Sequence, residues 1–130
     1  MTKKVLIIEG ESGLAHLAKA RLKLQGLDPK DIILSSTHEE AMEQVDKARE
    51  KGINVAIIGH ISHFRGLLDE QELIDLLRMK VPGITIVSCT GRAMMGADID
   101  IPRPDGYLKI EEVIGLSKKD KKYCLSHLVN

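Results

Sequence analysis

The sequence has no net charge and no long apolar run. Lysine plus arginine and aspartate plus glutamate number 19 each among 130 residues. A neutral molecule has no net field that would steer it onto phosphate backbones or anionic lipid. The first apolar run covers only residues 5–8, far too short for a signal peptide or a membrane-spanning helix. We therefore expect no nucleic-acid partner, no membrane and a cytoplasmic location.

Motifs of several common binding and catalytic sites are also missing. Cys89 and Cys124 do not form a CxxC pair, so we expect two reduced thiols rather than a disulfide. The turn at 10–13 lacks the third glycine of a dinucleotide-binding loop and places Glu11 where pyrophosphate would sit. No Walker P-loop or GxSxG elbow occurs, and Ser12 is a single hydroxyl where a flavin loop would have several. These absences exclude the corresponding nucleotide-binding and hydrolase functions.

Short apolar runs are present instead, and helical segments separate them. The runs are continuous rather than alternating, which is typical of strands covered on both faces. They lie at 5–8, 32–34, 55–58, 84–87 and, more weakly, 107–108. Strands that alternate with long helices indicate right-handed crossover units. The sequence therefore predicts one α/β domain, a doubly wound parallel sheet of about five strands.

Helix start and stop signals lie between these runs. Thr37 and Glu40 have the spacing of a capping box, and Asp69 begins a third helix with an acidic residue three positions on. Gly26 and Gly52 are the residue type that ends a helix most readily. The predicted buried faces are Leu14, Leu17, Ala18 and Leu22; Ala41, Val45 and Ala48; and Leu73, Leu76 and Leu77.

The segment 91–105 is predicted to be irregular. Gly96, Pro102 and Pro104 leave room for only a turn or two of helix around 92–97. Met94 and Met95 in this segment either line an adaptable protein-binding surface or fill gaps in the core. A last helix is predicted at about 118–129, after a domain core of about 3–116.

Ligands and chemistry in an open parallel sheet gather beyond the carboxyl ends of the strands. The order of residues at these ends resembles the receiver domain of bacterial response regulators. In that family the first strand ends in an acidic pair, the third in a phosphoacceptor aspartate, the fourth in serine or threonine and the fifth in a lysine followed by proline. The corresponding residues here are Glu9 and Gly10, Gly59, Ser88, and Lys109 followed by Ile110.

The resemblance implies a flavodoxin-like sheet with strand order 2-1-3-4-5 and helices on both faces. It also implies a signalling module that binds a partner protein of its pathway. The implied partner surface consists of the short fourth helix region, the fifth strand and the last helix. Whether the chain forms a homodimer is left open.

The departures from the receiver pattern alter this expectation. Gly59 has no side chain that could accept a phosphoryl group, and Gly10 removes one carboxylate of the acidic pair. A hard cation held by Glu9 alone would keep most of its water and bind weakly. We therefore predict a non-catalytic pseudo-receiver with no cofactor and with lost or weak magnesium binding. A working phosphorelay receiver with a non-standard acceptor, such as Asp98 or Asp100, is an alternative.

Another alternative is a small-molecule or metal-binding protein that uses the same crevice. His60, His63 and Glu9 are acceptable zinc ligands, and Glu11 is nearby in the sequence. The histidine spacing is not that of the helical zinc motifs, so we expect no metal there. Glu9 and Glu11 are otherwise interpreted as solvated loop carboxylates near a helix N-terminus, where negative charge is favourable.

Overall fold

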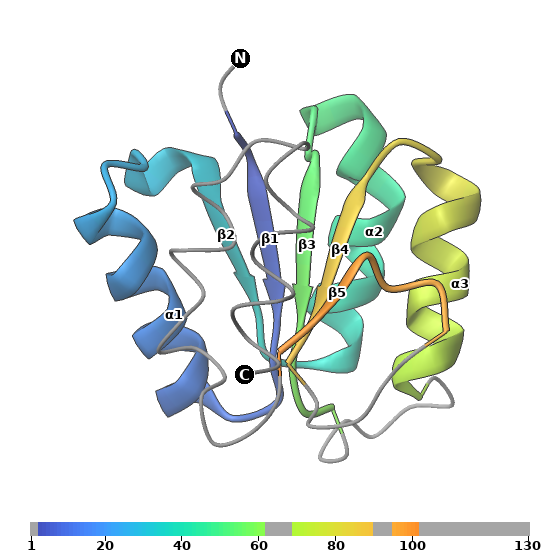
Figure 1. The fold of residues 1–130 in the computed structure, drawn as a ribbon, viewed down its shortest axis with the longest axis horizontal. Coiled ribbons are helices and arrows are strands. Elements are labelled where there is room, and N and C mark those ends of the chain that lie inside the picture. The colour runs from blue at the N-terminus through green and yellow to red at the C-terminus, as the bar shows by residue number, and fades with distance from the viewer. Residues whose placement is uncertain (1–2, 62–68, 90–94, 102–130) are drawn as a thin grey trace.

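The computed structural model describes residues 3–61, 69–89 and 95–101, which form a parallel sheet with helices on both faces (Figure 1). The strands are β1 (Val5–Ile8), β2 (Ile32–Ser35), β3 (Val55–Ile58), β4 (Thr85–Ser88) and β5 (Ile99–Asp100). The helices are α1 (Ser12–Leu24), α2 (His38–Lys51) and α3 (Glu70–Lys80), with a short 3-10 helix, η1 (Pro29–Asp31). The strand order β2-β1-β3-β4-β5 confirms the predicted doubly wound, flavodoxin-like fold.

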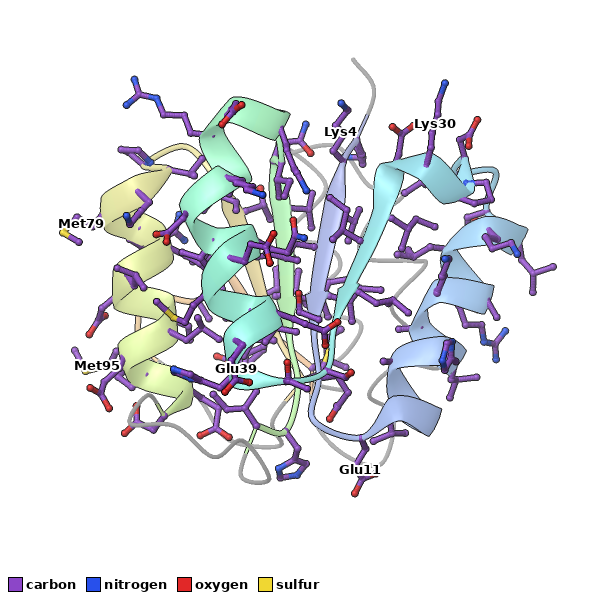
Figure 2. All side chains as sticks on the ribbon, turned by 180° about the vertical axis from the view of Figure 1, so that it is seen from behind. Lys4, Glu11, Lys30, Glu39, Met79 and Met95 are labelled. Carbon is purple, nitrogen blue, oxygen red and sulfur yellow. The ribbon has the colours of Figure 1, made fainter. Side chains whose placement is uncertain are left out.

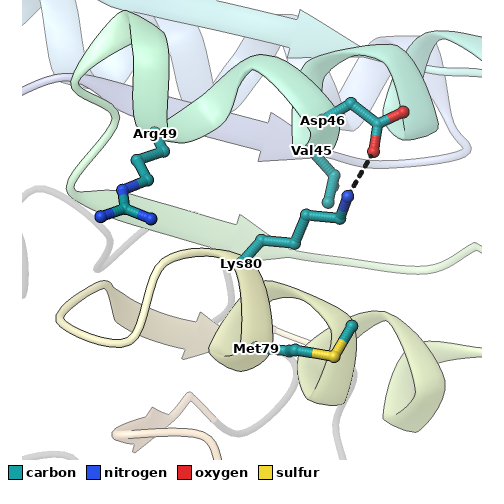
Figure 3. A pocket seen from close by; sticks show the side chains of 5 residues that line it. All are labelled: Val45, Asp46, Arg49, Met79 and Lys80. Carbon is teal, nitrogen blue, oxygen red and sulfur yellow. Dashed lines mark ion pairs between the residues drawn. The ribbon is translucent and has the colours of Figure 1, made fainter.

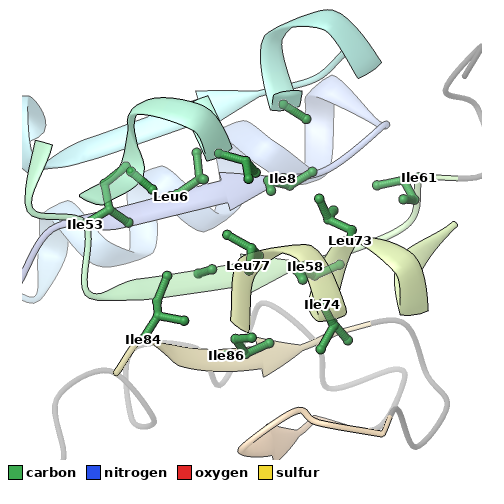
Figure 4. Packing of buried hydrophobic residues seen from close by; sticks show 14 residues of the cluster. Leu6, Ile8, Ile53, Ile58, Ile61, Leu73, Ile74, Leu77, Ile84 and Ile86 are labelled. Carbon is green, nitrogen blue, oxygen red and sulfur yellow. The ribbon is translucent and has the colours of Figure 1, made fainter. Parts of the chain in front are cut away.

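The sheet divides the core into two layers. On one face, Ala18 and Leu22 of α1 belong to the same buried cluster as Val5 and Ile7 of β1. On the other face, α2 and α3 cover the alternate side chains of the strands (Figure 4). That second cluster includes Leu6, Ile8, Ile58, Leu73, Leu77 and Ile86. Because both faces of the sheet are covered, the strands need apolar residues at consecutive positions.

The helix ends follow the predicted signals with one change. Asp69 and Glu72 form a complete capping box at α3. At α2 the Thr37 hydroxyl accepts the Glu40 N–H at 3.1 Å, but the Glu40 carboxylate accepts the Ser36 N–H at 3.2 Å rather than that of Thr37. Gly52 ends α2 with a φ of 74°, a left-handed conformation that glycine adopts without a steric penalty.

One buried position of α1 was predicted wrongly. Leu17 is 38% exposed, whereas Ala15 is only 2% exposed. The predicted stripe widened toward Leu17, but α1 packs on the sheet through Ala18 and Leu22, and the additional buried position is Ala15. Periodicity identifies the apolar side of a helix, while the orientation of its packing decides which flanking position is covered.

The fifth strand also differs from the prediction. Ile99–Asp100 forms β5 and pairs in parallel with Val87 and Ser88, inside the segment predicted to be irregular. Ten residues, 89–98, separate β4 from β5, which is shorter than the usual helical crossover between parallel strands. The weak strand predicted at 107–108 and the helix predicted at 118–129 lie outside the described residues.

Two side chains of α3 hold the segment 95–98, and we call these contacts the α3 clamp. The Gln71 side-chain amide donates to the Met95 carbonyl at 2.6 Å and accepts from the Met95 N–H at 3.1 Å. The Arg78 guanidinium donates to the Gly96 carbonyl at 2.8 Å and to the Asp98 carboxylate at 2.6 Å. The clamp therefore attaches the β4–β5 connection to α3 at two points.

Candidate functional site

Glu9 follows β1 directly and is completely buried. Its two carboxylate oxygens accept backbone hydrogen bonds, from the Glu11 N–H at 3.0 Å and from the His60 N–H at 3.2 Å. A buried carboxylate needs such donors because it has lost its hydration. Glu9 is thus part of the crevice wall, and the interpretation of Glu9 as a solvated loop carboxylate was wrong. Glu11 itself is exposed, as expected (Figure 2).

The backbone at the end of β3 lies against the end of β1. The Gly59 N–H donates to the Ile8 carbonyl at 2.8 Å, and the Gly10 N–H donates to the His60 carbonyl at 2.6 Å. Gly59 is buried. At the carboxyl end of this central strand the chain therefore presents backbone where a side chain could have carried chemistry.

Ser88 and Cys89 complete this edge of the sheet. Both are buried, and Ser88 pairs with Asp100 of β5. Burial and then the nearby Glu9 and Asp100 carboxylates raise the pKa of the Cys89 thiol. A protonated, buried thiol is a poor nucleophile and metal ligand, so Cys89 contributes packing. From the sequence, Asp100 was a candidate only as an alternative acceptor. Its place beside Ser88 depends on β5, which the sequence pattern did not reveal.

Known proteins match this chain through their structures. No family model matches, and no curated protein matches. A CheY-like response regulator receiver domain from Methanospirillum hungatei JF-1 is similar with a TM-score of 0.72 and 18% identity, over 95% of this chain and 98% of that one. The fold is that of response regulator receiver domains. A receiver domain protein from Clostridium thermocellum gives a TM-score of 0.71 at 17% identity, over 95% and 99% of the two chains. NtrX from Brucella abortus gives a TM-score of 0.72 at 16% identity; the match covers 95% of this chain and 28% of NtrX.

The receiver fold brings together four of the predicted positions. Glu9, Gly10, Gly59 and Ser88 all lie at the carboxyl edge of adjacent strands. His60 is half-buried beside them, and its backbone joins Glu9 and Gly10. The remaining two predicted residues, His63 and Lys109, lie outside the described residues.

The described part of the receiver fold contains no cluster of side chains that could bind a metal ion. Within 3–61, 69–89 and 95–101, no three His, Cys, Asp or Glu side chains are grouped so that they could hold a metal ion. The zinc interpretation needs His63, whose position is not described. Over the same residues, no helix has both the length and the apolar character needed to cross a membrane.

A shallow groove of about 360 Å³ lies elsewhere on the receiver fold, between α2 and α3 (Figure 3). Val45, Asp46, Arg49, Met79 and Lys80 line it. The Lys80 ammonium and the Asp46 carboxylate form an ion pair at 2.9 Å across the groove. Both helices run back along the sheet, so their C-terminal halves lie toward the amino ends of the strands. The groove is therefore separate from the crevice at the carboxyl edge.

Proposed function

We propose that this chain is a signalling module with a receiver fold that acts by binding a partner protein, without phosphorylation at the end of β3. The observation that carries the proposal is Gly59, which follows the central strand where the receiver family has its acceptor aspartate. A phosphoryl group can only be transferred to a nucleophilic atom, and glycine offers none. Magnesium binding would be lost or weak because glycine at positions 10 and 59 leaves Glu9 as the only one of the family's three carboxylates at this edge.

The contacts of Glu9 support this proposal. In a metal-dependent receiver the carboxylate after the first strand is available to a cation. Here the Glu9 oxygens accept hydrogen bonds from the Glu11 and His60 amides. A cation at Glu9 would have to replace these donors, and it would gain too few carboxylates to offset the loss of its own water.

The α3 clamp supports a partner surface that is held in one state. A receiver switches when phosphorylation shifts the population of its conformations. In this chain the Gln71 and Arg78 side chains hold residues 95–98 against α3. The region around β5 would then present one surface to a partner protein of the pathway, independently of phosphate.

β5 lies earlier in the chain than the fifth strand predicted from the sequence, which suggests another candidate for the counterpart of the family lysine. That lysine follows the fifth strand and precedes a proline. With Ile99–Asp100 as the fifth strand, the next basic residue in the sequence is Arg103, and Pro104 follows it. We therefore propose Arg103 rather than Lys109 as the counterpart of the family lysine.

The experiment is intact mass spectrometry after incubation with magnesium and a small-molecule phosphodonor. The natural chain and a Gly59→Asn variant should keep their mass, whereas Gly59→Asp should gain one phosphoryl group if the surrounding receiver geometry is retained. Asparagine is the matched control because it has the size of aspartate without its nucleophilic carboxylate. A phosphorylated natural chain would overturn the proposal.

A second pair of variants tests the basic position. Within the Gly59→Asp background, Arg103→Ala should suppress phosphorylation and Lys109→Ala should leave it. If Lys109→Ala suppresses phosphorylation and Arg103→Ala does not, Lys109 is the counterpart of the family lysine.

A further inference from the structure

Exposed apolar side chains mark two surfaces of the molecule. Among the described residues, the large hydrophobic side chains that are exposed are Leu17, Leu24, Met79 and Met95, at 38%, 77%, 71% and 82%. Leu17 and Leu24 lie on α1, and we call the exposed stripe around them the α1 surface. Met79 lies on α3 and Met95 is attached to α3 by the clamp, so we call the region around them the α3 surface. Met95 therefore does not fill a gap in the core.

The two surfaces carry opposite charge. Helix α1 contains no acidic residue, and its three basic residues are Lys19, Arg21 and Lys23. The beginning of α3, from its N-cap through residue 75, contains no basic residue, and its acidic residues are Asp69, Glu70, Glu72 and Asp75. All of these acidic residues except Glu70 are exposed. The basic residues on either side of Met79 in the sequence, Arg78 and Lys80, form ion pairs with Asp98 and Asp46. Arg21 lies one helical turn from both Leu17 and Leu24 on α1. On α3, Asp75 accepts a hydrogen bond from Gln71, the residue that holds Met95.

The α1 and α3 surfaces face away from each other. Helix α1 packs on one face of the sheet near β1 and β2, whereas α3 packs on the other face with β3 and β4. Figures 1 and 2 show α1 and α3 at opposite flanks of the molecule. One molecule can therefore use both surfaces at the same time.

We propose that copies of this chain associate head to tail, with the α1 surface of one copy on the α3 surface of the next. The contact would bury the exposed leucines of one copy against the exposed methionines of the other. It would also place basic side chains opposite acidic ones, which favours this orientation over like-with-like contacts. Because the whole chain has no net charge, no overall repulsion opposes self-association.

This contact differs from a two-fold dimer. Two different surfaces meet, so each added copy leaves one surface of each kind free, and the assembly grows until it closes into a ring or continues as a filament. The exposed apolar side chains are few and the charges are solvated, so the contact is weak and depends on salt. A membrane is a poorer occupant for α1, because its wider apolar side, with Ala15, Ala18 and Leu22, is already buried in the core.

The test uses sedimentation velocity on the full chain and two variants. The α1-surface variant is Lys23→Glu with Leu24→Glu, and the α3-surface variant is Asp75→Lys with Met95→Lys. Two single-charge controls, Lys30→Glu and Glu39→Lys, change exposed residues elsewhere on the fold (Figure 2). Circular dichroism establishes that each variant is folded before it is compared.

The natural chain should show an average sedimentation coefficient that rises with concentration, more at about 50 mM salt than at about 500 mM. Each surface variant should associate at least about tenfold more weakly, while both controls associate like the natural chain. The decisive sample is an equal mixture of the two surface variants. Each retains one intact surface, so the mixture should form a 1:1 heterodimer that cannot grow further.

Three results would overturn the proposal. The natural chain could remain monomeric at about millimolar concentration and low salt. A surface variant could associate as strongly as the natural chain. That result would show that the altered surface is not the contact between copies and would leave it to a different partner protein. The mixture could fail to form the heterodimer although each variant alone is monomeric, which would indicate a two-fold contact instead.

Discussion

Arg78 connects α3 to two neighbouring segments, and replacing it with methionine removes all of these bonds at once. Its guanidinium donates to the carbonyls of Gly96 and Ile84 and to the Asp98 carboxylate, the last at 2.6 Å. Methionine keeps an apolar stem of similar length, so the loss is mainly one of hydrogen bonds and charge. We therefore expect Arg78→Met to loosen the attachment of β5 to α3.

The expected cost follows from these contacts. Each bond to a backbone carbonyl contributes about 1 kcal/mol net, and more where the donor is charged. The side chains of Arg78 and Asp98 are each 31% exposed, so the ion pair is partly screened and is counted at no more than about 1 kcal/mol. The Asp98 carboxylate keeps the Ile86 N–H, which it accepts at 2.7 Å, so the variant does not leave it without a partner. The free energy of unfolding should fall by about 2–3 kcal/mol.

Urea denaturation of Arg78→Met measures this loss. The control is Lys47→Met, which removes an ion pair to Glu43 at 3.0 Å between side chains that are 49% and 59% exposed. That variant should unfold at the same urea concentration as the natural chain, because both side chains lie in solvent. Amide hydrogen exchange at Asp98 should also become faster in Arg78→Met but not in the control. A loss below about 1 kcal/mol, or one equal to that of the control, would refute the reasoning that the clamp holds β5.

Three further substitutions test the buried polar groups. The Ser35 hydroxyl is buried and has no hydrogen-bond partner among the described residues, so Ser35→Ala should leave stability unchanged or raise it by up to about 1 kcal/mol, and a clear loss in denaturant unfolding would contradict this. Glu9→Gln should lower stability by about 2–4 kcal/mol and speed hydrogen exchange at His60, because the amide NH₂ of glutamine would face an N–H donor; unchanged exchange at His60 would argue against the assigned contact. The raised pKa of the Cys89 thiol keeps the thiol protonated in the folded state, whereas the unfolded thiol ionises above about pH 8.5. The contribution of this group to the free energy of unfolding is therefore complete below that pH. Above it, the contribution falls by up to about 1.4 kcal/mol per pH unit. Denaturant unfolding measures the difference in the free energy of unfolding between the natural chain and Cys89→Ala. This difference should be smaller at pH 10 than at pH 7, and an unchanged difference would contradict a shifted pKa.

Local patterns in the sequence were sufficient for most of the framework. Four strands and three helices lie where the apolar runs and capping signals predicted them, because burial on both faces of a parallel sheet requires continuous apolar residues. Asp69 begins α3 and Gly52 ends α2 through interactions within a few residues of each helix end. Such short-range interactions can be read from spacing alone.

Tertiary structure decided the rest. Ile99–Asp100 is a strand only because it pairs with Val87 and Ser88, and two residues among glycine and prolines carry no periodic signal. The Glu9 carboxylate could be assigned to the carboxyl edge from its position after an apolar run. That this carboxylate is buried and accepts hydrogen bonds from the Glu11 and His60 amides depends on β1 and β3 lying side by side. Contacts between residues distant in the sequence follow from the packing of whole elements, so these parts of the site became visible only in the folded chain.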